Sequence, residues 1–140
     1  MDDAEAEVVR TIFDMYLHGS SIITIVRELN ACGIKSVTGK DKWCKRSIET
    51  ILCNEKYSGD VIVFKTLNVG YPEMKRQKNA GEKNKYISAG NHPPIVAKEA
   101  FVAVQAERDR RSNIQRDENG TRRKSTRYSS KRLPSQQEEA

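Results

Sequence analysis

The sequence lacks the motifs that mark common catalytic sites. It has no glycine-rich phosphate loop, no HExxH and no GxSxG pattern. Its serines gather at expected helix starts and near the C-terminal end, and no histidine is placed to activate them. We therefore predict that this chain alone is not an enzyme.

Cysteines are also few. Cys32, Cys44 and Cys53 are odd in number and isolated, and no CxxC or HxxxH spacing accompanies them. The pattern predicts reduced thiols in a cytosolic protein, with neither a metal site nor a cofactor.

Long apolar runs are missing. No run approaches the ~20 residues that a membrane helix needs, and the acidic start MDDAEAE lacks the hydrophobic stretch of a signal peptide. The sequence therefore predicts no membrane partner and a cytoplasmic location. Hydrophobic residues make up only 36% of the chain, and the mean hydropathy is -0.74. We expect part of the chain to stay outside a packed core.

Positive charge is abundant but unevenly placed. The net charge of +6 permits nucleic acid or an anionic membrane surface as a partner. Residues 1–34 hold two basic and six acidic residues, whereas residues 35–85 hold twelve basic and six acidic. Residues 108–132 hold ten basic and three acidic. The positive surface should therefore lie on the middle and C-terminal parts.

Apolar residues recur at helical spacing in four segments. The first runs from Asp3 to Leu17, with Leu17 on its apolar face and acidic residues at its start, where the helix dipole favours them. The second has Ser20 or Ser21 as N-cap and ends at Gly33. The third follows residue 43, and the last starts near residue 97.

The third helix is expected to have an apolar back and a basic front. Ile48, Ile51 and Leu52 should face inward. In the major groove Arg and Lys read guanine, and Ser or Thr adapt to several bases. Candidate DNA-binding residues are therefore those of this front and of the loop before it: Lys40, Lys42, Lys45, Arg46, Ser47 and Thr50. The alternative is two amphipathic helices joined by a solvated loop, because the connection exceeds the ~3–4-residue turn of a helix-turn-helix.

The single tryptophan, Trp43, has two interpretations. Beside Lys40, Lys42 and Lys45 its ring would stack on a base. We favour packing between the loop and the third helix, because large aromatic side chains usually serve burial. Cys44 follows at the N-cap position, where a thiol is a poor acceptor.

After the third helix the pattern changes to that of strands. Residues 61–64 are β-branched or aromatic and predict a strand, with a short return strand at Tyr86 and Ile87. The polar stretch of residues 68–85 predicts a long hairpin loop. Two prolines in residues 92–96 stop regular structure, and Phe101 and Val104 mark the apolar face of the last helix.

Residues 112–140 have almost no apolar periodicity. Such a segment buries too little surface to offset its ordering, so we predict a basic flexible linker or tail. Its candidate DNA contacts, suited to a phosphate backbone or minor groove, are Arg122, Arg123, Lys124 and Arg127. The alternative is a solvated tail without a partner.

The residues discussed so far resemble a known family. The resemblance is carried by EAEVVRTIFDMYLHGSSIITIVRELNACGI, KWCKRSIETILCNEKYSGDVI and HPPIVAKEAFVAVQ, in this order. These stretches are similar to the recombinase domain of large serine recombinases, the integrases and transposases of phages and mobile elements. The match runs from about Glu5 to Arg111.

The resemblance implies a role on DNA. Family members carry a preceding catalytic domain, whose serine forms a phosphoserine link to DNA, and a following zinc ribbon. Neither is matched here, so no catalytic serine and no metal ligand is carried over. The resemblance implies a middle domain that binds double-stranded DNA at the attachment site of a mobile element, together with other recombinase subunits. The resemblance also implies that the third helix lies against this DNA.

These inferences combine into one prediction. The fold class is α+β: a helical bundle resembling a winged helix-turn-helix, a small antiparallel sheet and a closing C-terminal helix. Residues 1–111 form the DNA-binding domain, and residues 112–140 the linker. The predicted function is sequence-specific DNA binding within a bacterial or phage-encoded site-specific serine recombinase, associated with the nucleoid. Two alternatives remain, a protein interaction module for recombinase assembly and a winged-helix transcription regulator.

Overall fold

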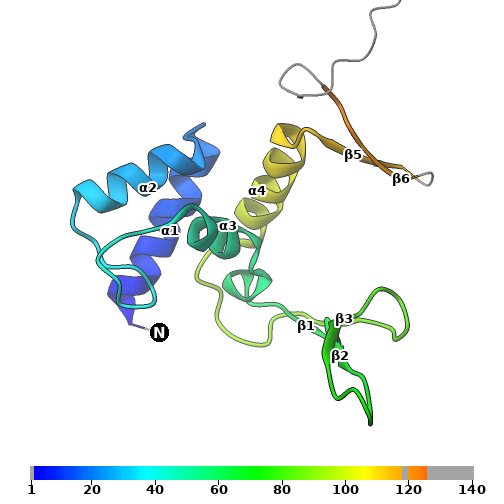
Figure 1. Cartoon of the computed structure of the whole chain (residues 1–140). Helices are drawn as coiled ribbons and strands as arrows, with labels where there is room; N and C mark the ends of the chain where they lie inside the picture. The colour runs from blue at the N-terminus through cyan, green and yellow to red at the C-terminus, as the bar shows by residue number, and fades with distance from the viewer. Residues whose placement is uncertain (1, 118–119, 126–140) are drawn as a thin grey trace, which may run out of the picture. The chain divides into compact units, whose positions relative to one another are not determined.

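The computed structural model describes residues 2–117 and 120–125 (Figure 1). By its internal contacts the chain divides into two compact units, residues 1–106 and residues 107–140. Helices and short antiparallel strand pairs make up the described part, so the predicted α+β class is confirmed. The helices are α1 (Asp3–Leu17), α2 (Ile22–Ala31), α3 (Lys45–Cys53), the 3-10 helix η1 (Glu55–Ser58) and α4 (Lys98–Arg111). Among the described helices none combines the length and the apolar character that a bilayer crossing requires.

Helix α1 supplies one wall of the hydrophobic core. Val9, Ile12, Phe13 and Tyr16 recur at helical spacing and are at most 3% exposed. The predicted bounds of this helix are confirmed. The placement of Leu17 on the same face is wrong, because its side chain is 37% exposed. Leu17 follows Tyr16 by one residue, about 100° of helical turn, which moves it off the apolar stripe.

Helix α2 is bounded by the two signals present in the sequence. The Ser21 hydroxyl accepts a hydrogen bond from the Thr24 backbone N–H (3.1 Å), so Ser21 is the N-cap. At the other end Gly33 has a φ of 65°. The Ile34 N–H then donates to the Leu29 carbonyl (3.2 Å), which is the long bond of a Schellman motif.

Helix α3 packs its apolar back into the same core. Ile48, Ile51 and Leu52 are buried, as predicted. The Gln105 side-chain amide of α4 donates to the Leu52 carbonyl (2.7 Å), which satisfies one of the free carbonyls at the end of α3. Residues 32–44 connect α2 to α3, so the connection is much longer than a helix-turn-helix turn of ~3–4 residues.

The chain returns along η1 before α4 begins. The Tyr57 carbonyl accepts hydrogen bonds from the N–H groups of Ile95 (2.9 Å) and Val96 (3.0 Å). Gly59 makes this close approach feasible. Its φ is 88°, and a Cβ at this position would lie 2.8 Å from the His92 carbonyl oxygen. A residue with a side chain therefore does not fit here without a backbone shift.

Helix α4 closes the first unit, as the sequence predicts. Val104 is fully buried in the core. The ring of Phe101 lies 6.2 Å from that of Phe13, measured between ring centroids. These contacts join the C-terminal helix to α1.

Two short hairpins lie one inside the other between η1 and α4. Strand β1 (Val61–Val63) pairs with β4 (Tyr86–Ser88), and inside this pair β2 (Thr66–Asn68) pairs with β3 (Arg76–Lys78). Both predicted outer strands are present, but the inclusion of Phe64 in the first is wrong, because Phe64 has a φ of 60° and β1 ends at Val63. The single long loop predicted over residues 68–85 is wrong, because it contains β3. All of β3 is exposed, so no alternating apolar face marks it in the sequence.

Residues 107–140 contain a further hairpin, in which β5 (Ile114–Asp117) pairs with β6 (Gly120–Arg123). The predicted lack of regular structure in residues 112–140 is wrong for this segment. Asn113 holds the open end, because its side chain donates to the Ser125 carbonyl and accepts from the Ser125 N–H, both at 2.9 Å. Residues 126–140 lie outside the described part, and the role of the segment as a linker stays a prediction.

Candidate nucleic-acid interface

The loop between α2 and α3 is an ordered turn that presents Lys40. The Ser36 N–H donates to the Lys40 carbonyl (2.9 Å), and the Lys40 N–H donates to the Ser36 hydroxyl (3.2 Å). The Gly39 N–H adds a bond to the Ser36 carbonyl (2.7 Å). Ser36 is buried, whereas Lys40 and Lys42 are exposed. The loop thus offers its cations from a backbone that is held in place.

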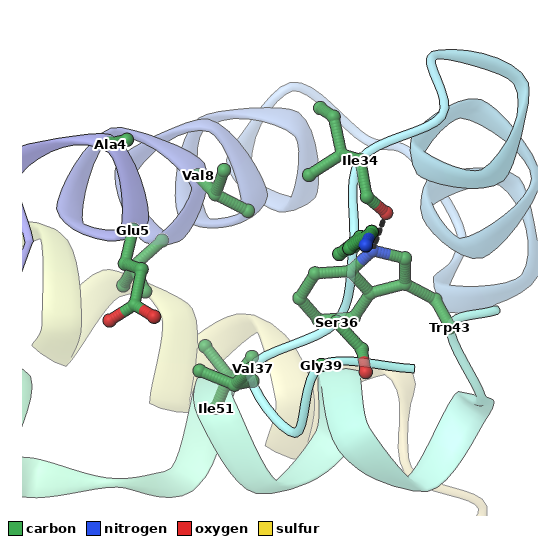
Figure 2. A pocket seen from close by; sticks show the side chains of 11 residues that line it. Ala4, Glu5, Val8, Ile34, Ser36, Val37, Gly39, Trp43 and Ile51 are labelled. Atoms are coloured by element: carbon green, nitrogen blue, oxygen red, sulfur yellow. Dashed lines mark hydrogen bonds between the residues drawn. The ribbon is translucent and has the colours of Figure 1, made fainter. Parts of the chain in front are cut away.

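Trp43 fastens this loop to α2 at the point where α3 begins. Its backbone N–H donates to the Asn30 side-chain oxygen (2.8 Å), and its indole N–H donates to the Ile34 carbonyl (2.8 Å), the bond drawn as a dashed line in Figure 2. The side chain is only 5% exposed. The packing interpretation of Trp43 is confirmed by this burial, as is usual for a large aromatic side chain.

A pocket of about 470 Å³ opens beside Trp43, between the first turns of α1 and the loop. Its wall is mainly apolar, with Val8, Val37 and Ile51 among its residues. Figure 2 shows the Glu5 carboxylate across the pocket from the indole. An apolar wall with a carboxylate disfavours a phosphate group, so this pocket is not part of the candidate interface.

The exposed front of α3 brings four of the predicted residues together. Lys45, Arg46 and Thr50 are exposed, and Ser47 is partly exposed. The Lys45 ammonium lies 3.7 Å from a Glu49 carboxylate oxygen, so part of its charge is balanced within the helix. The Thr50 hydroxyl donates to the Arg46 carbonyl (2.8 Å), which leaves its oxygen able to accept from a ligand.

Arg46 is the second cation on this front and directly follows Lys45. Its guanidinium has no ion-pair partner among the described residues. It stands in the first turn of α3, where free N–H groups and the helix dipole favour anions. The planar donors of arginine suit both the guanine edge and phosphate.

Cys44 is the exposed N-cap residue of α3. Its side chain caps no backbone N–H, in agreement with the sequence prediction, and its Sγ lies 3.1 Å from the Ser47 hydroxyl. The hydrogen bond with the Ser47 hydroxyl lowers the pKa of the Cys44 thiol, and the charge of Lys40 acts in the same direction. Within the described ranges, no three His, Cys, Asp or Glu side chains are grouped so that they could hold a metal ion.

The predicted C-terminal cations lie on and after β6, in the unit that does not contain α3. Arg122 forms an ion pair with Asp117 (2.8 Å), which balances its charge. Arg123 and Lys124 are exposed. Arg127 lies outside the described residues. The structure therefore brings three of these four residues onto one hairpin.

Sequence reasoning missed several exposed cations. Lys35 stands at the start of the ordered loop. Lys75, Arg76 and Lys78 lie at or beside β3, on the inner hairpin. Their charge is evident in the sequence, but the assignment of residues 68–85 to a loop gave no reason to place them on one element.

Known proteins similar to this chain identify its family. The sequence model of the Recombinase family matches residues 3–111, which is most of the chain. The chain belongs to the Recombinase family. Its fold is similar to that in the crystal structure of an LSR–DNA complex, with a TM-score of 0.53 and 23% identity over 82% of this chain. The family and fold predicted from the resemblance to large serine recombinases are confirmed. The match covers 30% of the other chain, so this chain spans less than a third of that protein.

Proposed function

We propose that this chain is the DNA-recognising middle domain of a site-specific serine recombinase, and that it binds the attachment site of a mobile element. The observation that carries the proposal is the cationic front of α3, on which Arg46 has no ion-pair partner within the described ranges, in a member of the Recombinase family. The similar fold of a protein whose structure was determined as a complex with DNA supports it.

In this proposal the front of α3 enters the major groove, which is wide enough to admit a helix. The apolar back of α3 stays in the core, so its exposed front is the part left to face the bases. Arg46 reads a guanine, while Ser47 and Thr50 adapt to neighbouring bases. Lys40 and Lys42 precede the helix and contact phosphates, which fix its register on the duplex.

We also propose that the chain binds DNA without cutting it. A serine nucleophile needs a neighbouring base. Ser47 lies against the Cys44 thiol, and Ser36 is buried by the loop that it organises. Strand exchange would come from a separate catalytic domain, with other recombinase subunits assembled on the same DNA. Such a protein would act in the cytoplasm, on the nucleoid.

The proposed site is tested by comparing Arg46→Ala with Lys40→Ala. Loss of a bidentate guanine contact costs about 1–3 kcal/mol of discrimination. Arg46→Ala should therefore weaken binding to the ends of the encoding element more than binding to scrambled DNA. Lys40→Ala should weaken both alike, because phosphate contacts carry no sequence information. A competition assay measures both. An equal loss on both DNAs for Arg46→Ala would show that it contacts phosphate.

The absence of cleavage is tested with supercoiled plasmid that carries the attachment site. The chain should bind this plasmid and leave its topology unchanged. Relaxation or nicking that copurifies with the protein would contradict the second proposal. No preference of the wild-type chain for its own element would contradict the first.

A further inference from the structure

The inner hairpin, residues 66–78, is a cationic arm. Its two strands pair with each other and pack against no helix, and Figure 1 shows them extending away from α1 and α2. Lys75, Arg76 and Lys78 are exposed. Within the described part of the chain, Lys75 and Lys78 have no ion-pair partner. Arg76 donates to the Thr66 hydroxyl (2.9 Å), which leaves its positive charge in place.

The tip of the arm carries two large apolar side chains in solvent. Tyr71 is 92% exposed and Met74 is 78% exposed. Met74 also has a φ of 44°, a conformation that residues with bulky side chains rarely adopt. The turn is closed by bonds from the Val69 N–H to the Lys75 carbonyl (2.8 Å) and from the Met74 N–H to the Gly70 carbonyl (3.2 Å). Apolar side chains held in water beside cations indicate a contact surface.

The base of the arm is fixed by Asn79, a side chain that is 1% exposed. Its amide nitrogen donates to the carbonyls of Phe64 (2.8 Å) and Lys83 (2.6 Å). Its oxygen accepts from the N–H groups of Gly81 (3.0 Å) and Lys83 (3.3 Å). All four hydrogen-bonding positions of the amide are used. The direction of the arm is therefore set at its base.

Two cations of the arm lie on the same face of β3. Arg76 and Lys78 are two residues apart on β3, so they share one face of the hairpin and stand about 6.8 Å apart along it. Two cations on the same face can therefore approach neighbouring phosphates of one DNA strand. Proteins that engage the minor groove combine such cations with apolar wedges.

We infer that the arm is a second DNA contact of this domain, with its cations on phosphates and its apolar tip in the minor groove. This inference rests on the proposed function of α3, because it assumes the same duplex as ligand. It differs from that function in its residues and in the groove that it occupies. The two contacts together extend the recognised site beyond the bases that α3 reaches.

The charge part of the inference is tested by Lys75→Gln and Lys78→Gln, measured separately. Each variant should reduce the steepness of log K against log salt by about 0.9 for each phosphate that it no longer neutralises. Arg27→Gln is the matched control, because it removes one positive charge from an exposed position of α2, which Figure 1 shows well away from the arm. It should leave the slope unchanged. All three variants should melt like the wild type.

The groove part is tested by Met74→Gly. Glycine adopts the φ of this position without strain, so the turn should be kept. The variant should bind the site several-fold more weakly with an unchanged salt slope. It should also lose protection of one adenine N3 from dimethyl sulfate, an atom that lies in the minor groove.

The outcomes separate the two proposals. If the wild-type chain binds the ends of its own element no better than scrambled DNA, both the proposed function of α3 and the proposed arm contact are contradicted. If it binds them better, and Arg46→Ala relaxes this preference, the function of α3 stands by itself. In that case, salt slopes for Lys75→Gln and Lys78→Gln equal to that of Arg27→Gln would overturn the arm contact. Unchanged adenine protection in Met74→Gly would overturn its place in the minor groove.

Discussion

At the scale of single residues, Gly59 is where the backbone leaves least room. It has a left-handed φ, and a Cβ would lie 2.8 Å from the His92 carbonyl oxygen. Gly33 has a similar φ of 65°, but nothing lies within 4 Å of its missing Cβ. A substitution at Gly33 therefore tests the free-energy cost of the left-handed backbone alone. A substitution at Gly59 adds the cost of the clash with the His92 carbonyl.

We predict that Gly59→Ala destabilises the domain more than Gly33→Ala. Gly33→Ala should cost about 1–2 kcal/mol, the usual penalty of a left-handed residue with a side chain. Gly59→Ala should exceed this, because the return segment at His92 must also shift. Urea denaturation of both variants measures the difference. Equal losses would contradict the close approach.

Glu55 is a buried carboxylate that joins η1 to the base of the arm through an ion pair with the Lys65 ammonium. Burial acts to raise the pKa of Glu55. The hydrogen bonds from Lys65 and the backbone, with the Lys65 charge, outweigh it, so the pKa is lowered. The ionised form is therefore the one that stabilises the folded protein.

The pH dependence of Glu55→Gln follows from this lowered pKa. The stabilisation by ionised Glu55 is present above the unfolded pKa of about 4.3. It is lost as the pH falls through the lower pKa of the folded state. The variant should have a lower free energy of unfolding than the wild type near neutral pH. This difference in free energy of unfolding should shrink toward zero in acid. Urea denaturation of both proteins between about pH 7 and pH 3 measures this. A difference that stays constant would contradict the role of the charge.

At the scale of elements, the burial of one face decides which helices the sequence can predict. Helices α1 and α3 each bury one face, so apolar residues such as Phe13 and Ile48 recur at helical spacing. Once the buried face of α3 is known from this spacing, its exposed face is known as well. Strands β3 and β6 expose every described side chain, so nothing alternates. Their hairpins depend on the side chains of Asn79 and Asn113, whose partners cannot be identified from spacing. The sequence therefore predicts that the cations of α3 share one exposed front, whereas it gives no such placement for the cations of the arm.

The start of α3 gives a prediction for a stabilising change. Cys44 already has the extended backbone of an N-cap, with φ −119° and ψ 156°, but its thiol caps no N–H group. Cys44→Ser should stabilise the domain by about 1 kcal/mol, the usual worth of a hydroxyl cap. Cys53→Ser is the control, because Cys53 is an exposed cysteine at the other end of the same helix. Thermal melting compares them, and no gain over the control would contradict the capping argument.

At the scale of the whole molecule, the C-terminal end of α4 is stabilised by its own side chains. The Glu107 carboxylate accepts hydrogen bonds from Arg110 and Arg111. These bonds and charges lower the pKa of Glu107 to about 2. Ion pairs within the last turns of α4 therefore contribute to holding its C-terminal end.

Deletion of residues 112–140 should accordingly leave the melting temperature of the first unit nearly unchanged. It should weaken DNA binding and flatten its salt dependence by about 0.9 for each phosphate that the deleted cations neutralise. Calorimetry and salt titrations of the full and shortened chains measure the two effects. A shortened chain that melts several degrees lower would show that the deleted segment packs on the first unit. An unchanged salt slope would show that its charges do not meet DNA.

Because one hairpin lies inside the other, the arm is an insertion between two paired strands. Its entry and exit already stand side by side, because Val63 pairs with Tyr86 in the outer hairpin. Replacing the inserted segment with a tight two-residue turn would therefore leave little loop to close. Hairpins of other lengths and sequences should fit between these two positions, provided that they keep Lys65, the ion-pair partner of buried Glu55. In the DNA-binding role that we propose, this boundary is the place at which the recognised sequence would be altered first.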